Sequence, residues 1–125
     1  MTRDMELIRK IVLEIESWKT VSPRKINIAG VDNDILARHL ELLHQAGMID
    51  ALFHQSSSRP VPDLVHITDL TWDGHDFAAS IKDENIWTKI KGSFSADVLV
   101  SLPLSIIKDL GIGLLKEWAK KQVGL

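Results

Sequence analysis

The feature that most constrains the fold of this chain is a leucine-rich helical stripe that stops at a glycine. Between residues 35 and 46, apolar side chains recur at the three- and four-residue spacing of one helix face. Asp32 or Asn33 can cap the start of this helix, and Gly47 is its expected end. The pattern predicts a helix with a well-defined beginning and end.

A β-hairpin is expected directly after this helix. Residues 48–54 and 64–67 have strand-like composition. They flank a polar tip at residues 55–62, whose serines, prolines and single arginine favour a turn. The tip is the one stretch of low complexity, and we find no internal repeat.

Three further elements complete the order along the chain. Apolar residues at helical spacing predict a first helix over residues 4–18, which Pro23 keeps from continuing. Residues 26–28 alternate in polarity and predict a short strand. Thr71 can cap a third helix after the hairpin, and its apolar spacing extends to Gly92.

The order helix, short strand, helix, hairpin, helix predicts an α+β, mainly α, fold. It is the order of a winged helix-turn-helix domain with a two-stranded wing. We assign residues 1–92 to this domain and residues 93–125 to an amphipathic helical tail. Where winged-helix repressors have a further full helix, the segment from Thr20 to Gly30 holds a proline and a strand, so the helix-turn-helix is expected to be truncated.

The tail has apolar residues on one helix face and lysines on the other from Leu104 onward. Gly111 and Gly113 weaken such a helix by up to roughly 1 kcal/mol each, so it needs a partner surface. We expect it to cover its own core or to form a homo-oligomer. Binding to a membrane surface is the alternative, because lysines accompany Trp118. The residues assigned to oligomerisation are Leu104, Ile107, Leu110, Leu114, Leu115 and Trp118.

Composition and the first residues indicate the cellular compartment and exclude some kinds of metal site. The chain has no cysteine, which excludes disulfides and thiolate ligands, and its first residues lack the pattern of a secretory signal. We therefore expect a cytoplasmic protein. His39 and His44 point to different helix faces, while His54 and His66 are expected to be cross-strand neighbours. We predict no metal site and no cofactor.

No pattern typical of catalysis is found. Asp73, His75 and Asp76 follow Thr71 at a helix start, where acids interact favourably with free amides and the positive end of the helix dipole. The sequence has no phosphate-binding loop and no nucleophile elbow. We therefore expect a non-enzymatic protein.

Charge argues against a dedicated nucleic-acid binder, because 15 Lys and Arg face 17 Asp and Glu, a net charge of -2. The sequence still allows a local basic patch, since basic residues outnumber acidic ones before Gly30. In a winged helix, the helix before the hairpin presents its early residues to base edges. Asp32, Asp34 and Glu41 on or beside that helix would repel phosphates. The candidate DNA contacts are Arg24, Lys25, Asn33, Arg38, Ser57 and Arg59.

Residues 35–49 (ILARHLELLHQAGMI) resemble the recognition helix and first wing strand of bacterial winged-helix repressors. Residues 3–9 (RDMELIR), 26–28 (INI) and 70–77 (LTWDGHDF) together resemble a bacterial and prophage family, domain of unknown function 2513. The resemblance covers nearly the whole chain. It implies a winged-helix fold and a bacterial or phage setting, and it carries no activity over.

Three functions remain open on these grounds. The leading hypothesis is a DNA-binding regulator of prophage type that acts as an oligomer through its tail. The second is a module that binds another protein and not DNA, favoured by the acidic residues of the candidate recognition helix. The third is a phage-defence or toxin-like effector with a membrane-active C-terminal helix.

Overall fold

The computed structural model describes residues 1–56 and 58–125. Its elements, in chain order, are α1 (Met5–Ser17), α2 (Asn33–Gln45), β1 (Ile49–His54), β2 (Leu64–Leu70), α3 (Trp72–Ile81), α4 (Glu84–Ser93), α5 (Ala96–Leu99) and α6 (Leu104–Gln122). The predicted α+β, mainly helical class is confirmed. The winged-helix assignment rests on the order of the elements and stays a prediction.

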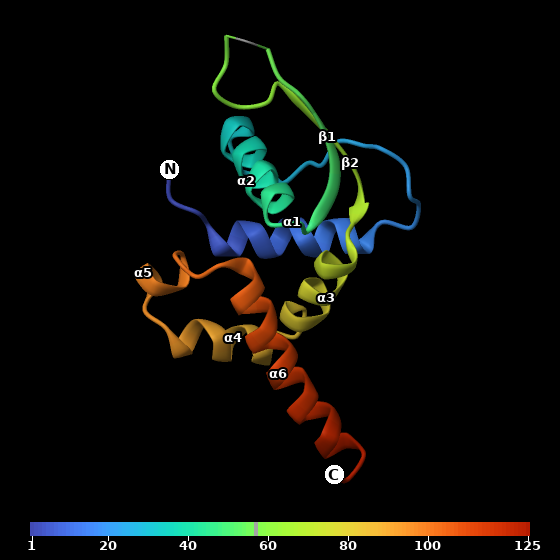
Figure 1. Ribbon diagram of the computed structural model, residues 1–125, viewed down its shortest axis with the longest axis vertical. Helices are drawn as coiled ribbons and strands as arrows, with labels where there is room; N and C mark the ends of the chain where they lie inside the picture. The colour runs from blue at the N-terminus through green and yellow to red at the C-terminus, as the bar shows by residue number, and fades with distance from the viewer. Residues whose placement is uncertain (57) are drawn as a thin grey trace.

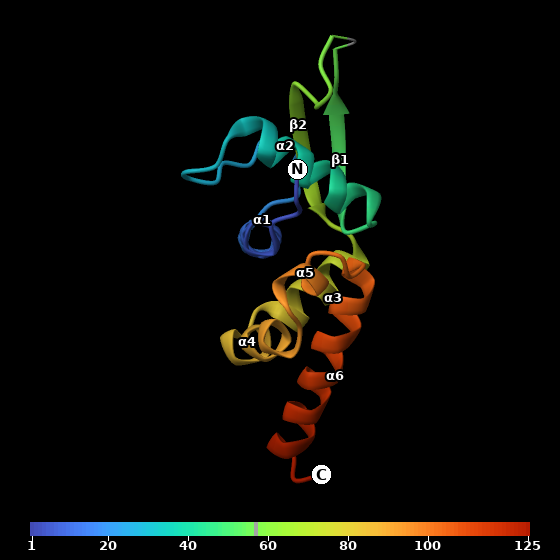
Figure 2. The same ribbon diagram turned by 90° about the vertical axis from the view of Figure 1, so that its left-hand side faces the viewer.

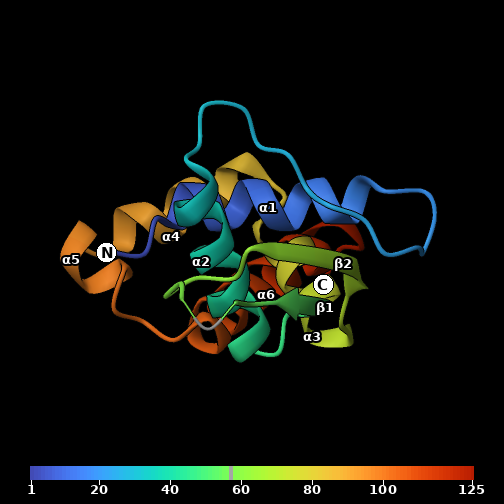
Figure 3. The ribbon, with the colours of Figure 1, turned by 90° about the horizontal axis from the view of Figure 1, so that it is seen from above.

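The helix α1 lies across the middle of the molecule (Figure 1). On one side of it stand α2 and the hairpin, and on the other lie α3, α4 and α6. Figure 2 shows the hairpin upright beside α2, and Figure 3 shows α1 passing beneath α2. One hydrophobic core joins the two sides, with Ile8 and Ile11 of α1, Ile67 of β2 and Phe77 of α3 all fully buried.

Both ends of α2 follow the local signals in the sequence. The Asp32 carboxylate accepts hydrogen bonds from two amides of the first turn, at 2.9 and 3.2 Å. At the other end Gly47 has φ +74°, and the N–H of Met48 donates to the carbonyl of Leu43 at 2.9 Å. This closure by a left-handed glycine ends α2 and turns the chain directly into β1.

The predicted hairpin is present and longer than expected. β1 and β2 pair antiparallel from Ile49 opposite Leu70 to His54 opposite Leu64, with an irregularity after Asp50. The second strand therefore continues three residues beyond position 67, the expected end.

The short strand predicted at residues 26–28 is wrong. The contact with the sheet occurs earlier, at Arg24, whose N–H donates to the carbonyl of Ile67 at 3.0 Å and whose carbonyl accepts from the N–H of Ile67 at 2.8 Å. Beyond this bridge the chain makes no further ladder with β2, and the side chain of Ile26 packs into the core. Alternation of polarity here reflects burial of a loop residue and not strand pairing.

The expectation that the third helix extends to Gly92 is also wrong, because two helices occupy this stretch. Asp83 has extended backbone (φ -71°, ψ 127°), and its carboxylate accepts from the N–H of Ile86 at 3.0 Å, which starts α4. The turn redirects the chain so that Trp87 and Ile90 of α4 are buried in the core.

The first half of α6 is part of this core. Leu104 and Ile107, which we assigned to oligomerisation, are buried inside the chain itself, so they have no surface to offer a partner. Gly111 lies against α3, where an added Cβ would come within 2.6 Å of the Ser80 Cβ. The C-terminal end of α6 extends away from the body (Figures 1 and 2).

Arg3 ties the start of the chain to the segment between α5 and α6. Its guanidinium Nη2 donates to the carbonyls of Leu99 at 3.1 Å and Leu102 at 2.5 Å. These carbonyls lie at or just after the end of α5, where helix carbonyls lack partners within the helix. Burial lowers the pKa of the Arg3 guanidinium.

Candidate functional site

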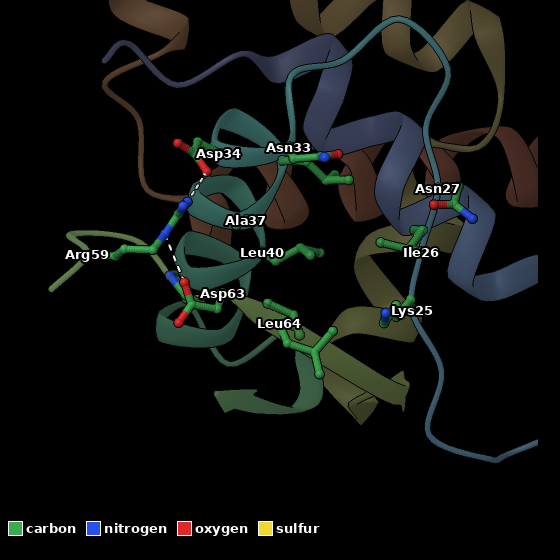
Figure 4. Close-up of a pocket in the computed structure, with 13 residues that line it drawn as sticks. Lys25, Ile26, Asn27, Asn33, Asp34, Ala37, Leu40, Arg59, Asp63 and Leu64 are labelled. Carbon is green, nitrogen blue, oxygen red and sulfur yellow. Dashed lines mark hydrogen bonds and ion pairs between the residues drawn. The ribbon is translucent and has the colours of Figure 1, made fainter. Parts of the chain in front are cut away.

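A cavity of about 480 Å³ opens between three segments that lie far apart in the sequence (Figure 4). The loop at residues 25–27 forms one side, residues 33–40 of α2 form the second, and residues 59–65, from the hairpin tip into β2, form the third. The cavity therefore lies where the candidate recognition helix meets the candidate wing.

The floor of the cavity is apolar and its rim is polar. Ile26, Leu40 and Val65 are buried side chains of the floor. Figure 4 shows Lys25 and Asn27 on one side of the cavity, across from the charged groups at the tip of the hairpin. Such an arrangement suits a ligand surface with an apolar centre and polar edges.

The far rim is an ion-pair network around Arg59. Its Nη2 lies 2.5 Å from the Asp34 carboxylate of α2, and its Nε lies 2.8 Å from the Asp63 carboxylate. Asp63 also accepts a hydrogen bond from the N–H of Ser56 at 2.9 Å. These contacts connect the hairpin tip to α2 and place one guanidinium against two carboxylates, so negative charge is in excess in this cluster. Exposed pairs of this kind contribute about 1 kcal/mol or less each.

The other two arginines proposed to contact DNA lie outside the cavity lining. Arg24 stacks over the ring of Trp18, 4.5 Å from its centroid, and donates to Thr20 Oγ1 at 2.6 Å. Arg38, on α2, lies 3.5 Å from the Glu41 carboxylate. The charge of Arg38 is therefore shared with an acid one turn along the same helix.

The structure thus brings Lys25, Asn33 and Arg59 together, while Ser57 lies outside the described residues. The sequence analysis missed Asp63 as a functional neighbour. The sequence carried no clear signal for this pair, because a spacing of four residues predicts pairing on a helix and residues 59–63 are not helical.

The residues assigned to oligomerisation divide between the core and the surface of α6. The exposed fraction is 38% for Leu110 and 56% for Trp118. Leu114 and Leu115 are half-buried and pack against the edge of the core. These four remain available to a partner, in contrast to the two buried in the core.

The string of acids and histidine after Thr71 has structural partners. The Thr71 hydroxyl donates to the carbonyl of Gly47 at 2.6 Å and accepts from the N–H of Gly74 at 3.0 Å, which caps α3. Asp73 lies 3.3 Å from Lys108 Nζ, and His75 lies 3.4 Å from Asp69. The geometry is that of a capped helix start with surface pairs.

Histidines at the hairpin are close neighbours, as expected. The ring centroids of His54 and His66 lie 5.5 Å apart with the rings at 83°. Across residues 1–56 and 58–125, no cluster of three or more His, Cys, Asp or Glu is placed to hold a metal ion. None of the helices in that part of the chain combines the length and apolar character needed to cross a membrane.

Comparisons with known proteins identify relatives of the chain. Residues 2–98 match the protein-family model described as "Hypothetical protein (DUF2513)". A protein of Haemophilus influenzae described as "Uncharacterized protein" is 30% identical over 112 residues, which cover 88% of this chain and 92% of the relative. No solved structure matches the chain.

Proposed function

The chain belongs to the DUF2513 family, and we propose that it is a non-enzymatic module that binds another protein through α2 and the hairpin. The supporting observation is that this surface neutralises its own arginines. Arg59 is paired with Asp34 and Asp63, and Arg38 with Glu41. Duplex DNA is held largely by cations that replace counterions along the phosphates. Arginines already engaged by carboxylates supply this interaction only after those pairs break.

The apolar part of the same surface suits a protein partner. Ile35, in the first turn of α2, is 37% exposed and lies between the capping Asp32 and Arg38. The buried floor of the neighbouring cavity adds apolar area within reach of an inserted side chain. Protein interfaces combine an apolar centre with a polar rim in this way.

The proposal is tested by measuring binding to DNA and, separately, crosslinking to protein. Fluorescence anisotropy with mixed-sequence duplexes at low and moderate salt is expected to give no salt-sensitive binding. In the native host, a photo-crosslinking amino acid in place of Ile35 is expected to give a discrete protein adduct. The same amino acid in place of Lys10, which is exposed on α1, is the control and is expected to give none.

Two substitutions test whether these arginines take part in binding. Arg38→Gln and Arg59→Gln are expected to leave the adduct at position 35 in place, because neither arginine supplies a free charge in this proposal. Salt-sensitive duplex binding that both substitutions weaken would refute it.

A DNA-binding regulator is the second candidate, favoured by a separate observation. Lys25 lines the cavity and Arg24 precedes it, and neither forms an ion pair within the part of the chain that the structure describes. Their charges are therefore not neutralised by a carboxylate, although Arg24 would have to leave Trp18 and Thr20 to contact a phosphate. On this candidate, replacing both by alanine lowers the slope of log affinity against log salt by about 2, equally for all duplex sequences.

A further inference from the structure

The C-terminal half of α6 extends beyond the body and exposes part of an apolar stripe. Trp118 is the largest side chain of this stripe, and more than half of its surface is exposed. Gly111 and Gly113 lower the helix propensity of the segment that leads to it. A half-helix with such a sequence is marginal in water unless its apolar face packs against something.

A groove of about 600 Å³ runs between α4 and this half of α6. Ile86 of α4 and Leu115 and Trp118 of α6 provide its apolar surface. Its charged residues are two acids and two lysines, one of each from α4 and its N-cap and one of each from α6. The rim is therefore neutral overall and carries both signs on each wall.

We propose that the C-terminal half of α6 from a second copy fills this groove, packed antiparallel about a two-fold axis. A two-fold interface brings the same patch of both copies together, so it must be complementary to itself. A rim with balanced charges meets this condition, whereas a rim of one sign would repel its copy. The balance also favours a second copy over a strongly charged partner such as an anionic lipid surface.

The helical positions determine which flanks of the two helices meet, and the charges on those flanks select the register. At 100° per residue, Leu114, Trp118 and Lys121 share one face of α6, and Glu117 flanks that face on the side of Lys121. In an antiparallel pair about a two-fold axis, each flank faces the same flank of the other helix. The register that brings opposite charges together places Glu117 opposite the partner's Lys121, and Lys121 opposite the partner's Glu117.

Light scattering on the full chain is expected to give the mass of a dimer. Glu117→Lys and Lys121→Glu each place like charges opposite one another at both ends of the interface. Each variant alone is expected to dimerise about tenfold more weakly or worse. An equimolar mixture of the two variants is expected to recover the affinity, because each lysine then faces a glutamate.

The mixture separates contact between copies from effects within one helix. Within the same helix Glu117 lies 3.7 Å from Lys120 and is four residues from Lys121, so each substitution can weaken that helix. Mixing leaves each helix unchanged, so recovery can come only from pairing between chains. Lys116→Glu, the same charge change on the opposite side of α6, is the matched control and is expected to dimerise normally.

Three results would overturn the proposal. One is a monomer mass at tens of micromolar, and another is a dimer that the charge reversals leave unchanged or that mixing does not restore. The third is binding of a monomeric chain to phosphatidylserine vesicles that Trp118→Ser abolishes, which would assign the stripe to a lipid surface. None of these measurements depends on α2 or the hairpin, so their results do not bear on the protein-binding surface proposed there.

Discussion

The ring of His39 is fully buried and is fixed by two backbone partners. The N–H of Asp4 donates to Nε2 at 2.8 Å, so Nδ1 carries the proton and donates to the carbonyl of Ile35 at 2.8 Å. Through this ring, the residue that caps α1 is joined to the first turn of α2. The histidine that sequence analysis placed on a helix face is therefore a structural link.

His39→Leu is expected to lower the free energy of unfolding by about 1–3 kcal/mol, because it removes both hydrogen bonds and leaves their backbone partners unsatisfied. Urea denaturation measures the loss. His75→Leu, at a half-exposed ring, is the control and is expected to change stability by about 0.5 kcal/mol or less. Equal midpoints for the two variants would contradict the role given to His39.

Glu6 links α1 to α4 and makes stability depend on pH. Burial by itself raises the pKa of Glu6. Hydrogen bonds from Lys91 (2.8 Å) and Trp87 (3.1 Å), together with the nearby charges of Lys91 and Arg9, outweigh this effect, so the net pKa is below its ordinary value. The stabilisation is complete above the ordinary value of 4.5 and is lost as the pH falls through the lower folded pKa.

Glu6→Gln should therefore cost stability near neutral pH and cost progressively less below pH 4.5. Urea midpoints of the two proteins, measured from about pH 6 to about pH 3, are expected to converge toward the acid end. A difference that stays constant over this range would show that the Glu6 carboxylate has no depressed pKa.

Helix α6 contains two glycines with opposite roles. At Gly111 an added Cβ would lie 2.6 Å from the Ser80 Cβ and 2.8 Å from the Ser80 carbonyl oxygen, whereas at Gly113 nothing lies within 4 Å. Gly111→Ala is expected to destabilise the protein by about 1–3 kcal/mol, because α3 and α6 must move apart. Gly113→Ala is expected to stabilise it by up to about 1 kcal/mol through helix propensity. Thermal unfolding of the pair, with changes of opposite sign, checks both roles.

Elements defined by local chemistry could be predicted from the sequence, and those defined by distant partners could not. The cap at Asp32 and the stop at Gly47 act within one turn, so α2 was placed to within a residue or two. A strand needs a pairing partner, and residues 26–28 do not pair with β2, although their polarity alternates. The break before α4 had a local signal in Asp83, but the continuous apolar spacing concealed it.

At the scale of the whole molecule, the sequence could name residues of the candidate site but not their partners. Lys25, Asn33 and Arg59 were identified, yet the cavity they share depends on three segments that only the fold brings together. The ion pair between Arg59 and Asp34 joins residues 25 positions apart. Likewise, the spacing of apolar residues located the helix after Pro103 but did not indicate how much of that helix is buried.

The hydrogen bonds of Arg3 span 96 and 99 positions of the chain. During synthesis on a ribosome, α1 must therefore wait for the segment before α6 to emerge before its own beginning is anchored. Leu104 and Ile107 must arrive as well, because they complete the core on the far side of α1. Contacts at such separation are slow to form, so the core on both sides of α1 is expected to be completed as one unit, after Ile107 has emerged. A fragment that stops at Gly92 would leave the ribosome as an incomplete fold.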